Sequence, residues 1–363
     1  MVRLVPNFFT MSMVAAVIVA VILAAFAAVT AIWVAAIERA HPAVGRLVPV
    51  TGGHLHVLDL SSGAAAPGPP IVLLHGASGN LHDLRVAFGE TLAKSRRVLL
   101  IDRPGHGWSD RPDEIADAAP ARQAALVREA LDALGIARVI IAGYSWSGAL
   151  ATAFTLAYPE RVAGLVLIAP VTHPWPRKTS WYNWIATMPV LGPLFVRTVA
   201  VPLGMLLIDS SARSVFTPQD MPDGYVKNIA ASLVLRPSTF IANAFDVTQL
   251  SGHLVEQSKR YGEIRVPTVI VTGDQDRTVS PNIHAEKIAA MVPGAELVIV
   301  PGIGHMVHHL APDVVIAAVE RVAERAQKSE SIIPARADID APLDLARPRE
   351  SGDLLYGLPL PRQ

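Results

Sequence analysis

Three kinds of side chain that can act together in nucleophilic catalysis occur far apart in this sequence. Ser145, His305 and a pair of aspartates, Asp274 and Asp276, each follow a short apolar run. A serine hydroxyl becomes a nucleophile when an imidazole removes its proton, and that imidazole needs a carboxylate to fix its tautomer and stabilise its charged form. The residue types therefore fit acyl transfer through a serine, provided that the fold brings them together.

The residues around Ser145 indicate how its side chain is presented. They read VIIAGYSWSG from residue 139 and continue into an Ala-rich helical pattern. A strand that enters a tight turn and then a helix projects a serine at the top of a sheet. The small residues Gly143, Ser147 and Gly148 allow the strand and helix backbones to approach each other around this turn. The segment resembles the nucleophile elbow G-x-S-x-G of the α/β-hydrolase superfamily, with Ser147 where the last glycine usually stands.

The chain order of the candidate residues matches the same superfamily, in which nucleophile, acid and base follow as Ser, Asp, His. The segment from residue 269 reads VIVTGDQDR, and the family pattern places the acid at Asp276, with Asp274 as the close rival. The segment from residue 298 reads VIVPGIGHM, which makes His305 the base. By this resemblance Ser145, Asp276 and His305 form the catalytic set.

Two further segments are similar to the superfamily. IVLLHGASG, from residue 71, ends in the His-Gly that precedes the oxyanion loop of these enzymes. The resemblance implies that the backbone N–H groups of Ala77 and Trp146 hold the negative oxygen formed during acyl transfer, while His75 braces the loop. DRPGHGWS, from residue 102, matches a turn D-x-P-G-x-G-x-S with a structural role. Asp102 and His106 are therefore left outside the mechanism.

Strand and helix patterns alternate through most of the chain and predict the fold class. Helical patterns at residues 121–134 and 283–291 separate some of the strands, and residues 54–60 alternate as an edge strand does. We expect an α/β-hydrolase fold with a mostly parallel central sheet and helices on both faces, in which residues 45–170 and 263–326 form the core. Apolar runs that predict buried parallel strands are residues 71–74, 98–101, 139–142, 165–168, 268–272 and 297–300.

The alternation of strands and helices stops in residues 171–262, which we expect to form a helical lid inserted into the core. Trp175, Trp181, Trp184 and the run 188–208 supply a large apolar surface there. This surface either binds an apolar group of the substrate or packs the lid onto the core, and the sequence favours neither. Residues 327–363 show little periodicity and are predicted to be a flexible tail.

Residues 11–37 form an uncharged apolar run, preceded by a short tail over residues 1–10. At about 1.5 Å per residue the run reaches about 40 Å, enough to cross a hydrocarbon core of about 30 Å. We expect a single transmembrane anchor, and hence a lipid bilayer as a partner. A cleaved signal peptide is the competing interpretation. The flanking charges favour a cytoplasmic N-terminus only slightly, so the side that the catalytic domain faces stays open.

Composition excludes several classes of function. Lys plus Arg and Asp plus Glu both number 31 among 363 residues, so nothing indicates a basic nucleic-acid-binding surface. The chain has no cysteine, which excludes disulfides, thiolate metal ligands and a cysteine nucleophile. His308 and His309 lack a further ligand set with suitable spacing, so we predict no metal and no cofactor.

The type of nucleophile narrows the reaction. Relatives in the superfamily that open epoxides or cleave carbon–halogen bonds use an aspartate at the elbow, whereas Ser145 implies acyl transfer. We expect a serine hydrolase that acts through an acyl-enzyme on a small ester-type substrate, with an apolar substrate as one option. The same residues fit a cofactor-free haloperoxidase or perhydrolase, or a carbon–carbon bond hydrolase. A non-catalytic, membrane-tethered binding protein is a further alternative, which the three intact side chains oppose.

Overall fold

Eight strands form the central sheet of the computed structural model, which describes residues 8–61, 68–176 and 179–332. Their order in the sheet is β1-β2-β4-β3-β5-β6-β7-β8. The β1–β2 and β2–β4 pairs are antiparallel, and all other pairs are parallel. The strands are β1 (Arg46–Val50), β2 (Gly53–Leu60), β3 (Ile71–Leu74), β4 (Val98–Ile101), β5 (Val139–Tyr144), β6 (Val162–Ile168), β7 (Thr268–Gly273) and β8 (Glu296–Val300).

Helices cover both faces of this sheet. One face is covered by α4 (Pro120–Ala133), α5 (Ser147–Ala157) and α11 (Ala285–Met291). The other is covered by α2 (Leu81–Leu84), η1 (Arg85–Gly89), α3 (Glu90–Leu92), α12 (Val307–Leu310) and α13 (Pro312–Ile332). Two short 3₁₀ turns, η2 (Ala116–Ala118) and η3 (Pro159–Arg161), lie in the connections.

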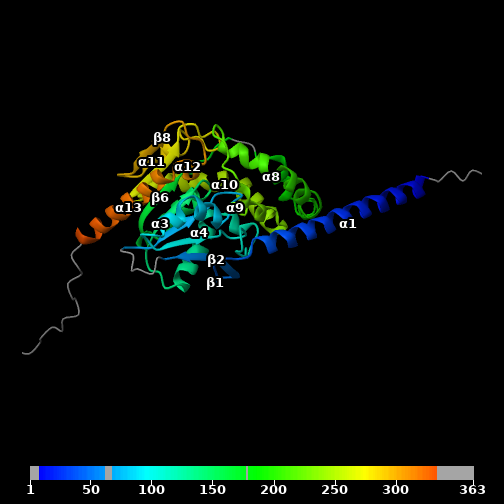
Figure 1. The fold of residues 1–363 in the computed structure, drawn as a ribbon, viewed down its shortest axis with the longest axis horizontal. Helices are drawn as coiled ribbons and strands as arrows, with labels where there is room; N and C mark the ends of the chain where they lie inside the picture. Colours follow the sequence, from blue (N-terminus) through cyan, green and yellow to red (C-terminus); the bar gives the residue numbers. More distant parts are fainter. Residues whose placement is uncertain (1–7, 62–67, 177–178, 333–363) are drawn as a thin grey trace, which may run out of the picture.

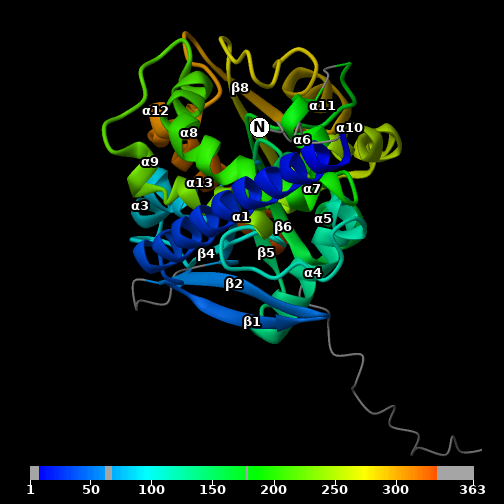
Figure 2. The same cartoon turned by 90° about the vertical axis from the view of Figure 1, so that its right-hand side faces the viewer.

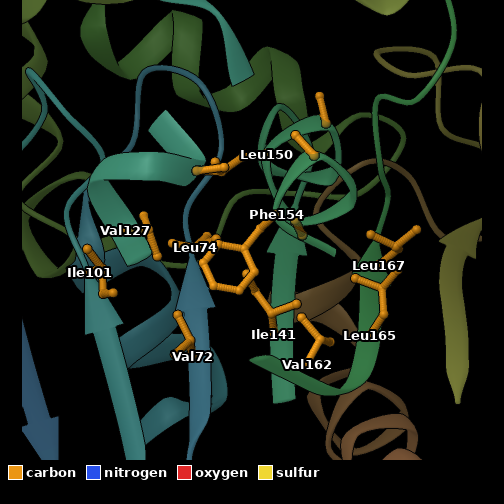
Figure 3. Packing of buried hydrophobic residues seen from close by; sticks show 14 of the residues in the cluster. Val72, Leu74, Ile101, Val127, Ile141, Leu150, Phe154, Val162, Leu165 and Leu167 are labelled. Atoms are coloured by element: carbon orange, nitrogen blue, oxygen red, sulfur yellow. The ribbon is translucent and has the colours of Figure 1, made fainter. Parts of the chain in front are cut away.

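The parallel strands are buried on both faces, as their unbroken apolar runs predict. In β3, Val72 and Leu74 join the cluster of buried side chains on one face, and Ile71 and Leu73 join the cluster on the other. Figure 3 shows Phe154 of α5 packed among the strand residues of the first cluster. Every residue of such a strand therefore contributes to a core, which keeps the strand ends fixed.

The predicted strands and the observed ones agree from β3 onward and differ at the first edge of the sheet. Residues 54–60 lie in β2, which has a neighbour on each side, so the prediction of an edge strand there is wrong. The edge strand is β1 (Figure 2). It escapes prediction because its five residues include Pro49, and proline is tolerated in a strand mainly at a sheet edge.

Between β6 and β7 the described residues form helices and no strand, and we call this segment the insert. It leaves the sheet at the carboxyl end of β6, the edge at which the parallel strands end. Its helices are α6 (Trp181–Ala186), α7 (Leu191–Phe195), η4 (Val196–Ala200), α8 (Val201–Phe216), α9 (Tyr225–Asn228), η5 (Ala231–Leu235), α10 (Pro237–Gln257) and η6 (Ser258–Glu263).

A long helix, α1 (Phe8–Ala40), precedes the sheet, and its N-terminal part projects away from the body (Figure 1). Its segment Met11–Ala40 has a mean hydropathy of 2.8 and is mostly exposed, so it is long and apolar enough to cross a membrane. Leu191–Phe216 of the insert meets the same criteria with a mean hydropathy of 1.9, but a larger share of it is buried. Length and composition alone do not separate an anchor from a signal sequence.

The C-terminal helix α13 is longer than the sequence pattern indicates. It runs through Ile332, so residues 327–332 are helical, although they were expected to begin the flexible tail. The apolar side chains of α13, such as Val315, Val319 and Val322, pack on the sheet and carry the helix across its face. Residues 333–363 of the predicted tail lie outside the described residues, as do residues 1–7.

Candidate active site

Ser145 lies in a sharp turn between β5 and α5. Its φ angle is 50°, in the left-handed region, which costs a non-glycine residue about 1–3 kcal/mol. Two backbone hydrogen bonds hold this conformation: the N–H of Ser145 donates to Ile168 O, and the N–H of Val171 donates to Ser145 O, both at 2.9 Å. The turn therefore fixes the serine at the carboxyl edge of the sheet.

Close approach of the backbones explains the small residues around this turn. A Cβ atom at Gly143 would lie 2.1 Å from Ser147 O, and one at Gly148 would lie 2.5 Å from Pro170 Cβ. Ser147, which stands where the motif has its last glycine, is fully buried, and its hydroxyl donates to His75 O at 2.5 Å. This departure from the motif is accommodated, because the extra hydroxyl ties the serine turn to the His75 loop.

The structure brings together the three side chains at Ser145, His305 and Asp276. His305 Nε2 lies 3.0 Å from Ser145 Oγ, and His305 Nδ1 lies 2.7 Å from Asp276 Oδ2. The loops after β7 and β8 supply the acid and the imidazole, and none of the three residues is more than 8% exposed. When Nδ1 carries the proton and donates it to the carboxylate, Nε2 is left as the acceptor that faces the serine hydroxyl.

The two neighbouring aspartates differ in what they contact. Asp276 Oδ1 accepts hydrogen bonds from the N–H groups of Thr278 and Val279, both at 2.8 Å, which orients Oδ2 towards the imidazole. Asp274 is exposed, and its Oδ1 accepts from the N–H of Gly302 at 2.7 Å. In the described parts of the chain Asp274 makes no hydrogen bond to His305, so Asp276 is the one of the two that contacts the imidazole.

The loop that carries Ala77 runs beside the nucleophile turn. A Cβ atom built on Gly76 would lie 3.1 Å from Ser145 Cβ. Among the described residues, the backbone N–H groups of Ala77 and Trp146 donate to no protein acceptor. Backbone donors that are left free beside a nucleophile are suited to receive the negative oxygen of a tetrahedral intermediate.

One helix of the insert, α10, contacts both of these turns. Asn243 Oδ1 accepts from the N–H of Ser78 at 2.7 Å, and Trp146 Nε1 donates to Asp246 O at 3.0 Å. Ser78 has a φ angle of 56°, so its hydrogen bond stabilises a second left-handed residue, next to Ala77. Sequence reasoning missed Asn243 and Asp246, although two polar residues three positions apart share one face of a helix.

A buried ion pair lies against Trp146. Arg103 has no exposed surface, its Cζ lies 4.0 Å from the centroid of the Trp146 ring, and its Nη1 donates to Asp246 Oδ2 at 2.5 Å. Arg103 Nη1 also donates to Gln123 Oε1 at 3.1 Å, and Arg111 Nη1 donates to Asp246 Oδ1 at 2.8 Å. Asp246 therefore joins the insert to the core through charge-assisted hydrogen bonds.

His75 and Asp102 brace loops, as their motifs indicate. Burial, followed by the nearby charge of Arg103, lowers the pKa of His75 to about 4, so the ring is neutral at pH 7. Its Nδ1 donates to Gly76 O at 2.8 Å, and its Nε2 accepts from the N–H of Arg103 at 3.0 Å. Asp102 Oδ1 accepts from the N–H of Leu81 at 2.7 Å. Both side chains hold backbone in place beside the site.

Ser145 is nearly closed off in this conformation. Two cavities, of about 390 and 290 Å³, lie elsewhere: the first between the end of α1, α8 and α9, and the second beside the start of β6. Neither cavity is lined by Ser145, His305 or Asp276. The serine itself is 8% exposed.

A second titratable cluster lies near Tyr144, whose ring centroid is 4.0 Å from that of His308 and 5.2 Å from that of His305. Asp83 is bonded through Oδ2 to His308 Nε2 at 3.3 Å and through Oδ1 to His309 Nε2 at 2.7 Å. These three residues offer ligand atoms within 4.8 Å of one another, the kind of set that can hold a divalent metal. Burial lowers the pKa of His308 to about 4, and Asp83 already serves both rings as an acceptor. That this protein uses no metal stays a prediction.

Comparison with known proteins agrees with this geometry. The sequence family described as alpha/beta hydrolase fold matches residues 69–312. A 2-hydroxy-6-oxo-6-phenylhexa-2,4-dienoate hydrolase of Burkholderia cepacia is 32% identical over 250 residues, which cover 66% of this chain and 82% of that protein. An uncharacterized protein of Mycobacterium tuberculosis is 29% identical over 281 residues, which cover 73% of this chain and 78% of that protein.

Solved structures show the same fold. A thermophilic esterase from Thermogutta terrifontis has a TM-score of 0.60 at 21% sequence identity, covering 78% of this chain and 98% of its own. A carboxylesterase from Bacillus subtilis has a TM-score of 0.55 at 17% identity, covering 82% and 98%. The family match spans Ser145, Asp276, His305 and most of the sheet that holds them, and the chain belongs to the α/β-hydrolase fold family.

Proposed function

We propose that this chain is a membrane-anchored serine hydrolase that cleaves an ester bond through an acyl-enzyme. The observation that carries the proposal is the hydrogen-bonded series from Ser145 Oγ through the His305 ring to Asp276, with distances of 3.0 and 2.7 Å. This arrangement lies beside two backbone N–H groups without protein acceptors in the described residues. Nucleophile, base, acid and oxyanion donors are thus within reach of one reacting carbonyl.

Acylation begins when His305 Nε2 takes the proton of the Ser145 hydroxyl as its oxygen attacks the ester carbonyl. The carbonyl oxygen becomes negative and accepts hydrogen bonds from the N–H groups of Ala77 and Trp146. Each such donor is worth about 2.7–4 kcal/mol of transition-state stabilisation. His305 then gives the proton to the leaving alcohol, and Asp276 stabilises the imidazolium through Nδ1.

Deacylation repeats these steps with water in place of the serine hydroxyl. His305 Nε2 takes a proton from the water, the hydroxide attacks the acyl carbonyl, and the proton returns to Ser145 Oγ as the acid leaves. The same N–H groups hold the oxyanion in both halves of the cycle. The strained turn keeps Ser145 in place throughout, so little reorganisation is needed between the two steps.

Cleavage of a carbon–carbon bond by the same residues is the second candidate, because a relative at 32% identity is named as a dienoate hydrolase. A dienoate carries a carboxylate, which needs a cationic partner in the site. The buried cation next to Trp146 is Arg103, and Asp246 neutralises it at 2.5 Å. An uncharged ester is therefore the better fit, and parallel rate measurements on a nitrophenyl ester and a dienoate would separate the two.

The anchor part of the proposal rests on α1. Its residues 8, 9 and 11–22 are exposed in an apolar helix, which a water-soluble protein does not leave uncovered. Membrane insertion covers this surface. The alternative, a signal peptide that is removed, predicts a mature protein that lacks α1, and mass spectrometry of the protein purified from membranes decides between them.

The mechanism is tested by labelling the full-length protein with a fluorophosphonate probe, which forms a covalent bond to activated serines. We expect labelling of wild type and none of Ser145→Ala. His305→Ala should label at a rate reduced by about 10³-fold or more, since the hydroxyl loses its base. Ser210→Ala removes an exposed serine of α8 and serves as the matched control, with labelling equal to wild type. Equal labelling of Ser145→Ala would refute the assignment.

A further inference from the structure

The part of α1 nearest the body packs on the insert rather than standing free. Exposure along α1 falls at Leu23, Ala27, Thr30, Val34 and Ile37, a spacing that places all five on one face of a helix. That face contacts η4, α8 and η5 of the insert. The first buried residue on that face is Thr30, which is 3% exposed.

The exposed length of α1 is comparable to the thickness of a bilayer. Residues 8–29 span about 33 Å at about 1.5 Å per residue, and the hydrocarbon core is about 30 Å thick. A membrane-spanning α1 therefore leaves the hydrocarbon core near Thr30, the first buried residue in the described part of this helix. The helices that pack on α1, which are η4, α8 and η5, then lie next to the membrane surface.

The junction between α1 and the body is held firmly. Ile37 is 4% exposed and packs in a cluster with Leu233 and Leu235. Glu38 pairs with Arg236 at 3.4 Å, and the backbone oxygen of His41 accepts a hydrogen bond from the Trp108 ring at 3.0 Å. The direction of α1 thus fixes which side of the body faces the bilayer.

The side of the insert around α1 is apolar and exposed. Figure 2, viewed from the side to which α1 projects, shows α6, α7 and α8 around it. Between residues 179 and 208 the sequence has one charge, Arg197. We call the following residues the docking face, each of them between 47% and 80% exposed: Trp181, Trp184, Val190, Leu191, Leu206 and Leu207.

Other residues of η4 and α8 in the same segment are packed into the protein. Val196, Ala200, Val201 and Phe216 are at most 4% exposed. A helix that buries one side in protein and exposes apolar side chains on the other is suited to lie in the plane of a membrane surface. Exposed tryptophans are also typical of the boundary between headgroups and acyl chains.

We propose that the docking face lies in the headgroup–acyl boundary of the bilayer that α1 spans, so that the insert rests on the membrane. This inference depends on the anchor in the proposed function and is independent of the catalytic mechanism. A lipid bilayer is favoured over a second copy of the chain as the occupant, because α1, whose exposed apolar surface needs the same cover, packs directly on η4 and α8 of the insert. The insert then separates Ser145 from the bilayer.

The absence of cysteine allows single-site labelling at three places in the full-length chain. Leu206→Cys probes the docking face, Val19→Cys probes the free part of α1, and Glu160→Cys is a matched exposed control at the amino end of β6. Each variant carries an environment-sensitive nitrobenzoxadiazole dye and is reconstituted into phosphatidylcholine vesicles. Quenching is measured with lipids that carry a nitroxide near the headgroup or near the acyl end. Far-UV circular dichroism checks that each variant is folded.

We expect the dye at position 206 to be quenched about twofold more by the shallow nitroxide than by the deep one, as for a helix at the interface. Position 19 should show the reverse order, and position 160 no quenching. Lack of quenching at 206 with quenching at 19 would overturn the docking face and leave the anchor standing. Deeper quenching at 206, equal to that at 19, would overturn it in favour of a second span. Lack of quenching at both would remove anchor and docking face together.

Discussion

Replacing Asp276 by asparagine should inactivate the enzyme without unfolding it, because the change acts on the tautomer of His305. The side chain keeps its size. In the wild type the N–H groups of Thr278 and Val279 donate hydrogen bonds of 2.8 Å to Asp276 Oδ1, and the amide oxygen of the asparagine can still accept both. The amide nitrogen then occupies the position of Oδ2, which lies 2.7 Å from His305 Nδ1. A donor at that position forces the proton of the ring onto Nε2.

A protonated Nε2 faces the Ser145 hydroxyl 3.0 Å away and cannot accept its proton. An exchange that inverts the tautomer in this way lowers kcat by about 10⁴, or about 5.5 kcal/mol of transition-state stabilisation at about 1.4 kcal/mol per tenfold change. The assay is the hydrolysis of p-nitrophenyl butyrate by full-length protein in detergent micelles. The melting temperature is measured in parallel and should change little.

Asp274→Asn is the matched control, because Asp274 stands two residues away and accepts from the N–H of Gly302 outside the site. Its kcat should stay within about threefold of wild type, because Asp274 does not contact His305 in the described residues. Its free energy of unfolding should change by no more than about 0.5 kcal/mol, as is usual for a surface substitution. A rate for Asp276→Asn within tenfold of wild type would refute the tautomer argument. An equal loss in Asp274→Asn would show that the acid has been assigned to the wrong residue.

Three further predictions concern the insert, the buried imidazoles and the substrate. Asn243→Ala removes the acceptor of the Ser78 N–H, so kcat should fall roughly tenfold with little change in KM. Asn243→Asp still accepts this hydrogen bond and should retain most of the activity. The pKa of His75 is lowered to about 4, so between about pH 6.5 and 4 the unfolded chain binds a proton at this residue that the folded chain does not. The melting temperature should therefore fall as the pH is lowered from about 6.5 to 4. The fall should be less steep in His75→Gln. If the insert binds an acyl chain, kcat/KM should rise from p-nitrophenyl acetate to longer esters, and equal values along the series would exclude that role.

Much of the sheet could be predicted because its strands are buried on both faces. The runs from Ile71 and from Val98 have no polar residue and are bounded by polar or turn-forming residues. Each strand could therefore be predicted from its own sequence, without knowledge of its neighbours. Ser145, Asp276 and His305, which the structure brings together, could also be selected as candidates, since each follows such a strand. β1 was missed because Pro49 and its exposed residues carry no such pattern.

The partners that support the site could not be found in this way. Asn243 is hydrogen-bonded to Ser78, which lies 165 residues away in the sequence, and Asp246 to Arg103, which lies 143 residues away. No local pattern encodes a contact of that separation, because it depends on how the insert folds back over the sheet. A polar residue on an apolar helix predicts that some partner exists, and only the tertiary arrangement identifies which one.

These contacts limit how the insert can open. Ser145 is 8% exposed, and α10 of the insert is hydrogen-bonded to both turns beside it. Movement of α10 would break the hydrogen bond from Ser78 to Asn243 and release the loop that carries Ala77. It would also separate Asp246 from Arg103 and leave a buried charge unpaired, at a cost of about 3–5 kcal/mol. Movement of α6 to α8 costs neither contact. Any opening of the insert is therefore expected in those outer helices, with α10 remaining in place to hold the loop that carries Ala77.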